Sequence, residues 1–172
     1  MNETIHNLIT RRSIRSYRPD MVPDSDLQMI TEAGLNAASG MGRQPTVIVE
    51  VKDRKTRDQL SRMNAEIMGT EADPFYGAPV VFVVLANKDV PTYIYDGSLV
   101  LGNMMAAAHA LGLGSCWIHR AREEFESAEG KELLQKWGIA GNYEGIGHMI
   151  VGYTDQKLGE RKIKPGRVVK AE

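Results

Sequence analysis

The segment Ala78–Ala86, with the sequence APVVFVVLA, decides the fold. Its residues from Val80 to Leu85 are all apolar, and most are β-branched or aromatic, which is typical of a β-strand. A run without polar alternation indicates a strand that is covered on both faces. We therefore expect this segment to be the central strand of a sheet that has helices on both sides.

The segment Gly97–Ile118, farther along the chain, is also strongly apolar. Its 22 residues would be long enough to cross a bilayer. Its four glycines and the break Gly112-Leu113-Gly114 instead favour a helix buried inside a protein, so we expect no membrane span. We place this helix from about Thr92 to Leu111. One chain of this size cannot easily cover such a helix on every side, which hints at a subunit interface.

Apolar spacing and turn signals predict the remaining elements. We expect helices at Thr4–Thr10, from Pro23 to Ala38, after an N-cap at Asp53 and at Glu129–Trp137, and strands at Thr46–Val51, Ser115–Ile118 and His148–Tyr153. No repeat or linker divides the chain, so we expect a single domain over residues 1–172. The predicted class is α+β, with helices around a central mixed β-sheet of four or five strands.

Composition excludes several classes of function. Of the 172 residues, 42% are hydrophobic and 25% are charged, which is enough apolar material for a core. The net charge of −1 argues against a dedicated nucleic-acid binder. The single cysteine and the absence of metal-ligand spacing among the four histidines predict neither disulfides nor a metal site. The polar start, Met1–Thr4, predicts no secretory signal and therefore a cytoplasmic protein.

Four arginines lie within the eight residues Arg11–Arg18, with Ser13 among them. In an extended segment alternate side chains point the same way, so Arg11, Ser13 and Arg15 can converge. Guanidinium and hydroxyl donors suit phosphate oxygens. The residues leave two interpretations open, a phosphate clamp for a small ligand or a solvated basic patch. No glycine pair completes the strand–GxGxxG–helix unit of a dinucleotide fold, and no phosphate loop of the GxxxxGK type is present.

Taken together, four motifs in this order resemble the FMN-dependent nitroreductase family, over about Ile5 to Arg167. They are Arg11–Tyr17 (RRSIRSY), Ala37–Pro45 (AASGMGRQP), Asn64 with Asp73–Pro79 (DPFYGAP), and Gly112–Ile118 (GLGSCWI) with Val151–Tyr153 (VGY). The resemblance implies a nitroreductase-like fold and an intertwined homodimer with FMN at the subunit interface. The helix predicted above, too apolar for one chain to cover, agrees with such an interface.

The resemblance also implies which residues hold the cofactor. The FMN phosphate and ribityl chain would be bound by Arg11, Arg12, Ser13 and Arg15, with added charge from Lys162 and Lys164. The second subunit would contribute Ser39, Gly40 and Gln44. Asn64 would hydrogen-bond the pyrimidine edge of the flavin, and backbone contacts, including a donor near N5, would come from Trp117, Ile118 and His119. Three residues depart from the family pattern, namely Ala38, Gly42 and Thr46.

The function that the resemblance implies is an NAD(P)H-dependent FMN oxidoreductase. NADH or NADPH would pass a hydride to flavin N5, and a nitroaromatic, quinone or similar flat electrophile would then take its place, giving ping-pong kinetics. No catalytic side chain is expected, since FMN carries the chemistry. Two alternatives remain open: a dedicated metabolic dehydrogenase or dehalogenase on the same scaffold, and a flavin-binding protein without turnover.

Overall fold

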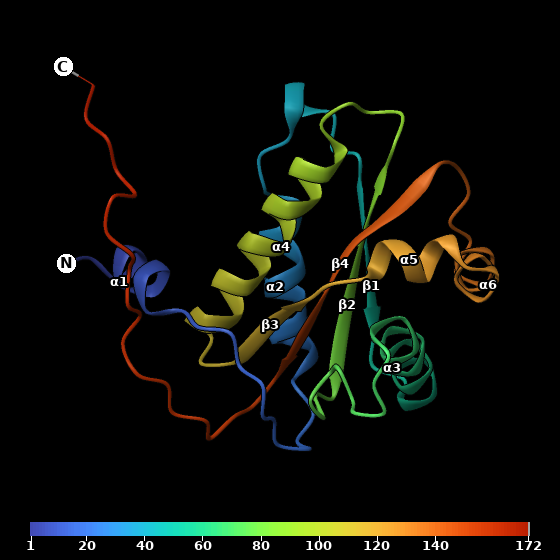
Figure 1. Ribbon diagram of the computed structural model, residues 1–172, viewed down its shortest axis with the longest axis horizontal. Helices are drawn as coiled ribbons and strands as arrows, with labels where there is room; N and C mark the ends of the chain where they lie inside the picture. The colour runs from blue at the N-terminus through green and yellow to red at the C-terminus, as the bar shows by residue number, and fades with distance from the viewer. Residues whose placement is uncertain (172) are drawn as a thin grey trace.

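A computed structural model describes residues 1–171 and gives the arrangement of Figure 1. In chain order the elements are α1 (Glu3–Thr10), α2 (Asp24–Leu35), a 3-10 turn η1 (Gly40–Gly42), β1 (Thr46–Val51), α3 (Arg54–Met68), β2 (Val80–Asn87), α4 (Tyr93–Ala110), β3 (Gly114–Ile118), α5 (Ala121–Glu126), α6 (Ala128–Lys136) and β4 (Tyr143–Gly152). The α+β class is confirmed. The short helix α5 was not anticipated from the sequence.

The sheet has the strand order β1-β2-β4-β3, and all its neighbouring strands pair antiparallel. The expectation of a mixed sheet therefore holds only for one isolated parallel bridge, between Ser13 and Ser115. The loop before β2 returns the chain to the end of the sheet where an antiparallel β2 must begin. It folds back along α3, where Asp73 accepts hydrogen bonds from Arg57 (2.5 Å) and Ser61 (2.6 Å). The chain thus starts β2 at the end of the sheet where β1 finished.

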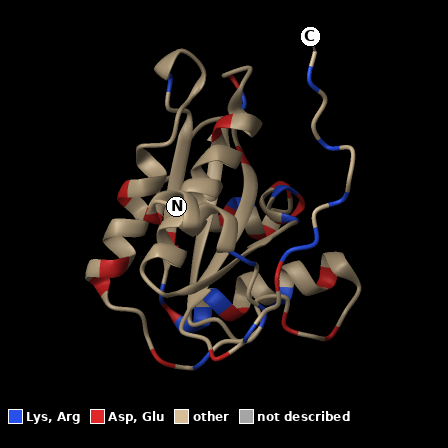
Figure 2. Cartoon of the chain, turned by 90° about the vertical axis from the view of Figure 1, so that its left-hand side faces the viewer, with Lys and Arg blue, Asp and Glu red and all other residues tan. Residues whose placement is uncertain are grey.

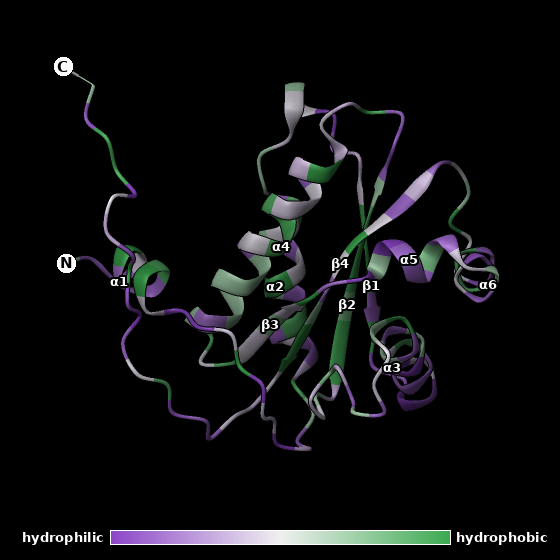
Figure 3. Cartoon of the chain, in the orientation of Figure 1, coloured by the Kyte–Doolittle hydropathy of each residue, from purple (hydrophilic) through white to green (hydrophobic). Residues whose placement is uncertain are grey.

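Strand β2 is buried along both faces, as its sequence predicts. Its side chains at Val80, Phe82, Val84 and Ala86 belong to the core between the sheet and the helices α2 and α4. The intervening Val81, Val83 and Leu85 belong to a second core, beneath α3, α5 and α6. The sheet thus separates two helical layers, with the apolar β2 at its centre (Figure 3).

Helix α4 is covered on only one face within a single chain. Its buried side includes Val100, Leu101 and Met104, whereas Tyr95 and Leu99 are 71% and 49% exposed. The helix α1 also exposes apolar side chains, at Ile5, Leu8 and Ile9, and it projects from the body beside the extended C-terminal tail (Figure 1). No helix within residues 1–171 is long and apolar enough to cross a membrane.

Two glycines in β4 create the space that positions the connection between β3 and α5. A Cβ atom on Gly145 would lie 2.2 Å from the carbonyl oxygen of Ala121, so the first turn of α5 packs directly on the strand. A Cβ atom on Gly147 would lie 2.5 Å from Nε1 of Trp117, whose indole occupies that space. These close approaches fix both ends of the segment from Trp117 to Ala121.

Replacing Gly145 with alanine should lower the free energy of unfolding by about 1–3 kcal/mol, because the new methyl group meets backbone that cannot rotate away. Gly147→Ala is the matched control, since its obstacle is a side chain that can shift. We expect a smaller loss for Gly147→Ala, accompanied by a change in tryptophan fluorescence. Urea denaturation of both variants measures the difference, and equal losses would contradict this account.

Candidate functional site

The arginine-rich segment lies along the edge strand β3. Ser13 forms the parallel bridge with Ser115, and the Ile14 N–H donates to the Ser115 carbonyl at 2.9 Å. On its other side the Arg15 N–H donates to the side-chain oxygen of Gln156 at 2.8 Å. The segment is therefore held in an extended conformation between β3 and the start of the tail. Such a conformation is the one that lets alternate side chains share a face.

Two arginines of this segment keep hydrogen-bond donors that no described residue uses. Arg11 Nη1 and Arg12 Nε are buried and have no acceptor within residues 1–171. Burial, and then the charge of Arg161, lower the pKa of Arg11 below its usual value. Arg12 Nη1 donates to the carbonyl oxygens of Ile9 and Arg11, each at 2.8 Å, which fixes its guanidinium. Crowded cations with unused donors form a site that favours an anion.

The other two arginines of the segment differ from each other. Arg18 is paired with Asp20 at 2.8 Å and lies 5.4 Å from the centre of the Tyr153 ring. Arg15 is exposed, and its guanidinium forms no ion pair with the residues that the structure describes. Arg15 is thus available to a ligand, whereas the guanidinium of Arg18 is already paired with a carboxylate of the same chain.

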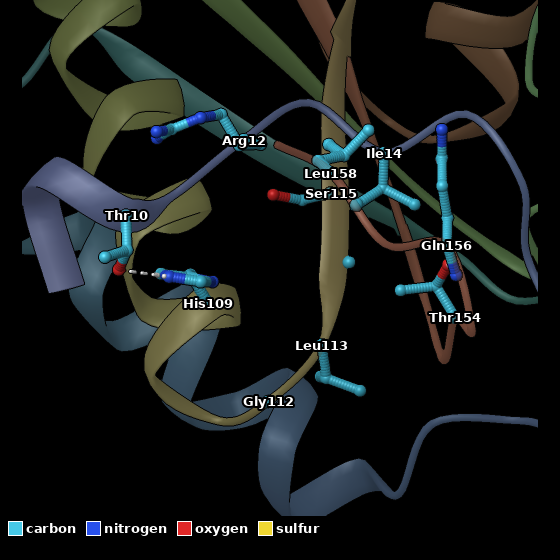
Figure 4. Close-up of a pocket in the computed structure, with 11 residues that line it drawn as sticks. Thr10, Arg12, Ile14, His109, Gly112, Leu113, Ser115, Thr154, Gln156 and Leu158 are labelled. Atoms are coloured by element: carbon cyan, nitrogen blue, oxygen red, sulfur yellow. Dashed lines mark hydrogen bonds between the residues drawn. The ribbon is translucent and has the colours of Figure 1, made fainter. Parts of the chain in front are cut away.

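A cavity of about 290 Å³ opens beside Arg12 (Figure 4). Ser115 contributes a buried hydroxyl oxygen without a partner among the described residues. On the opposite wall His109, in the last turn of α4, shares a hydrogen bond of 2.9 Å with Thr10 Oγ1. Thr154 and Gln156 complete the polar lining. The cavity therefore combines a cation with neutral donors, a set that suits a phosphate oxygen.

The residues expected at the flavin ring lie at the other end of β3. Trp117 and His119 line a second cavity of about 290 Å³, together with Arg120. Ile118, between Trp117 and His119 in the sequence, is buried and does not line this cavity. Arg120 has a φ of 80°, a left-handed conformation that is uncommon for a residue other than glycine and is often found at functional sites.

Ser39 and Gln44 line a third cavity, of about 350 Å³, near the start of α4. Gly40 lies beside them, where its N–H donates to Asp96 at 2.9 Å. Gly42 has a φ of 66°, a conformation that glycine adopts without strain. The residues assigned to the second subunit are therefore grouped, away from the arginine segment of the same chain.

Lys162, Lys164 and Asn64 lie outside these three cavities. Both lysines are exposed on the tail, which carries several basic residues away from the body (Figure 2). Their neighbour Arg161 is the tail residue whose charge reaches Arg11, and sequence reasoning did not identify it. Asn64 is fully buried, and its amide donates to the His119 carbonyl at 2.7 Å. As placed, Asn64 contacts the backbone of the site from behind.

Comparison with known proteins identifies the class. The model of the nitroreductase family matches residues 8–75 and 66–153, so the chain belongs to this family. It is 30% identical to the NADPH-flavin oxidoreductase of Vibrio harveyi, over 98% of this chain and 73% of that protein. The FMN reductase [NAD(P)H] of Bacillus subtilis is 28% identical over the same shares. A nitroreductase with bound FMN from Bacteroides fragilis has the same fold, with a TM-score of 0.92 and 26% identity over 100% of both chains.

The pKa of His109 should lie below its ordinary value of 6.5, because burial and then the charge of Arg11 disfavour the imidazolium, with smaller effects of His6 and Arg12. The folded protein then binds fewer protons at this site than the unfolded chain. Its contribution to the free energy of unfolding is therefore complete above about pH 6.5 and is lost as the pH falls below that value.

An NMR titration of His109 measures this pKa, and Arg11→Ala should raise it. Arg18→Ala is the control, because Arg18 does not contribute to the shift and its substitution should leave the titration unchanged. A pKa of 6.5 or higher in the unmodified protein would be inconsistent with the crowded cationic environment.

Proposed function

We propose that the chain is an NAD(P)H-dependent FMN oxidoreductase that reduces nitroaromatics, quinones or similar flat electrophiles. The observation that carries the proposal is the pair of unused, buried guanidinium donors at Arg11 and Arg12 beside Ser13. These donors fit the monophosphate of FMN. This chain also lacks the GxGxxG fingerprint of a dinucleotide-binding fold. Relatives named as NADPH-flavin oxidoreductase and FMN reductase support the same chemistry.

The residues have separate roles in this proposal. The phosphate and ribityl chain are bound by Arg11, Arg12, Ser13 and Arg15, and the tail adds Lys162 and Lys164. FMN, when bound, supplies the hydride chemistry. The protein supplies hydrogen-bond donors to the flavin ring, since the backbone of Trp117, Ile118 and His119 at the end of β3 faces the ring in this proposal. Donors of this kind stabilise negative charge that develops on a bound ring.

The binding site is shared between two chains in this proposal. The three cavities, of about 290, 290 and 350 Å³, are each near or below the lower end of the range for small-molecule sites, about 300 to 1,000 Å³. A second chain placed on the exposed face of α4 would bring Ser39, Gly40 and Gln44 to the flavin. The exposed apolar surface at Tyr95 and Leu99 is what such a homodimer would bury.

One site that serves the nucleotide and the acceptor in turn predicts ping-pong kinetics. The visible spectrum of the purified protein, recorded before and after adding NADH or NADPH, tests the whole proposal. We expect a flavin spectrum that bleaches with the nucleotide and recovers with a quinone. Extraction of FAD, or no flavin after reconstitution with FMN, would refute it. A yellow protein that neither nucleotide bleaches would instead indicate a flavin-binding protein without turnover.

Arg15→Ala should weaken FMN binding about ten- to a hundredfold, since a charge-assisted hydrogen bond contributes about 1.5–3 kcal/mol. Arg18→Ala should have a smaller effect, because the Arg18 guanidinium is already paired with Asp20. Titration of the FMN-free protein with FMN, followed by flavin fluorescence, gives both dissociation constants. Equal losses for the two variants would favour a diffuse basic patch over a clamp.

Leu99→Glu should produce a monomer that retains its fold but binds FMN poorly. Leu99 is 49% exposed in the single chain, so a charge there leaves the core intact and disfavours burial against a second chain. Met105, in contrast, packs partly against the core, so its substitution would also destabilise the monomer. Light scattering with absorbance detection measures mass and flavin together. A wild-type monomer carrying stoichiometric FMN would refute the shared site.

A further inference from the structure

The core behind the end of β3 contains a polar network that the proposed function does not use. Glu124 and His148 are fully buried, with 2.9 Å between Glu124 Oε2 and His148 Nε2. Asn64 is also fully buried, and its amide donates both to Glu124 Oε1 and to the His119 carbonyl. A chain of hydrogen bonds thus leads from β4, through α5 and α3, to the peptide that follows His119.

The surroundings of this network are apolar. The rings of Phe75 and Phe125 flank His148, with centroid distances of 5.3 and 6.2 Å. Placing a carboxyl group, an imidazole and an amide there costs free energy that a core of apolar side chains would not incur. Hydrogen bonds are strong in such a low-dielectric core, so the three bonds of this network hold Asn64 and the His119 carbonyl in one arrangement, while Asn64 Oδ1 and His148 Nδ1 have no partner among the described residues.

The direction of one peptide group shows what this network can fix. The described backbone has no cis peptide bond, so the carbonyl and N–H of the His119–Arg120 peptide point in opposite directions. Asn64 holds that carbonyl toward the core, and the Arg120 N–H is therefore directed away from the core. No acceptor for this N–H is found within residues 1–171. Immediately after this peptide group the backbone of Arg120 adopts the left-handed conformation, with a φ of 80°.

We propose that Asn64, Glu124 and His148 are positioning residues that orient the His119–Arg120 peptide, so that its N–H is presented to the edge of the bound flavin. The inference rests on the proposed function, and it replaces the expected direct contact between Asn64 and the flavin. Glu124 holds Asn64 in place, and His148 holds Glu124. The effect on the reaction is transmitted through the peptide group alone.

Asn64→Asp is the sharpest test, because it places a carboxylate oxygen opposite the His119 carbonyl and turns the peptide. The rate constant for reduction of the bound flavin by NADH or NADPH should fall about ten- to a hundredfold, as for the loss of a preorganised donor. Glu124→Gln keeps the shape but weakens the support of Asn64, and its rate constant should fall about three- to tenfold. FMN affinity should change little in both variants, since the arginine clamp remains.

Ser61→Ala is the matched control. Ser61 lies one turn from Asn64 on α3, is also buried, and donates to Asp73 at 2.6 Å away from the His119 peptide. It should lower the melting temperature without changing the reduction rate. In the FMN-free protein, the NMR shift of the Arg120 amide should move in Asn64→Asp and Glu124→Gln but not in Ser61→Ala.

The possible outcomes separate the alternatives. An effect of Asn64→Asp with none of Glu124→Gln would mean direct contact with the flavin and overturn the proposal, as would variants that lose only thermal stability. If Asn64→Asp does not fold, Glu124→Gln and His148→Gln decide the same question. A wild-type protein that binds no FMN would refute the proposed function, while the Arg120 amide shift in the FMN-free variants would still test the network.

Discussion

The burial of β2 on both faces is the constraint on which the rest of the structure depends. Because alternate side chains of this strand enter two different cores, helices must cover both sides of the sheet. The strand order then leaves β1 and β3 as the edges. Only an edge strand has free backbone groups, and β3 uses them to align the arginine segment through Ser115. The position of the candidate phosphate clamp thus depends on the strand order, which places β3 at a free edge of the sheet.

The fold was largely predictable from local sequence signals. The apolar run predicted β2, the N-cap at Asp53 holds the start of α3 as expected, and the β-branched run Thr46–Val51 is β1. Strand direction was not predictable, since it depends on the path of the loop between α3 and β2, whose contact between Arg57 and Asp73 joins residues sixteen positions apart. The helix α5 has six residues and too short an apolar pattern to be recognised, and its place depends on the contact between Ala121 and Gly145.

The residues of the candidate site also fall into those that the sequence predicted and those that it could not predict. The arginine segment was found from residue types alone, because a clamp for phosphate needs guanidinium groups wherever the backbone lies. The position of Asn64 could not be found like this, since its partners His119 and Glu124 lie 55 and 60 residues away. The lysines of the tail show a further limit. Their charge is evident from the sequence, but the sequence does not show where an extended tail places it, and in the structure it is Arg161 whose charge lowers the pKa of Arg11.

The left-handed residues near the site have a consequence for how the sequence can change. Gln44 and Arg120 have φ values of 47° and 80°, which glycine would adopt without strain. Each side chain there raises the free energy of the native state by about 1 kcal/mol or more. A population of variants selected for heat resistance alone should therefore accumulate glycine at these two positions. Selection for turnover should retain Gln44, which is assigned to the flavin site, so the two kinds of selection would drive that position in opposite directions, whereas glycine at position 120 would keep the backbone N–H that the site uses.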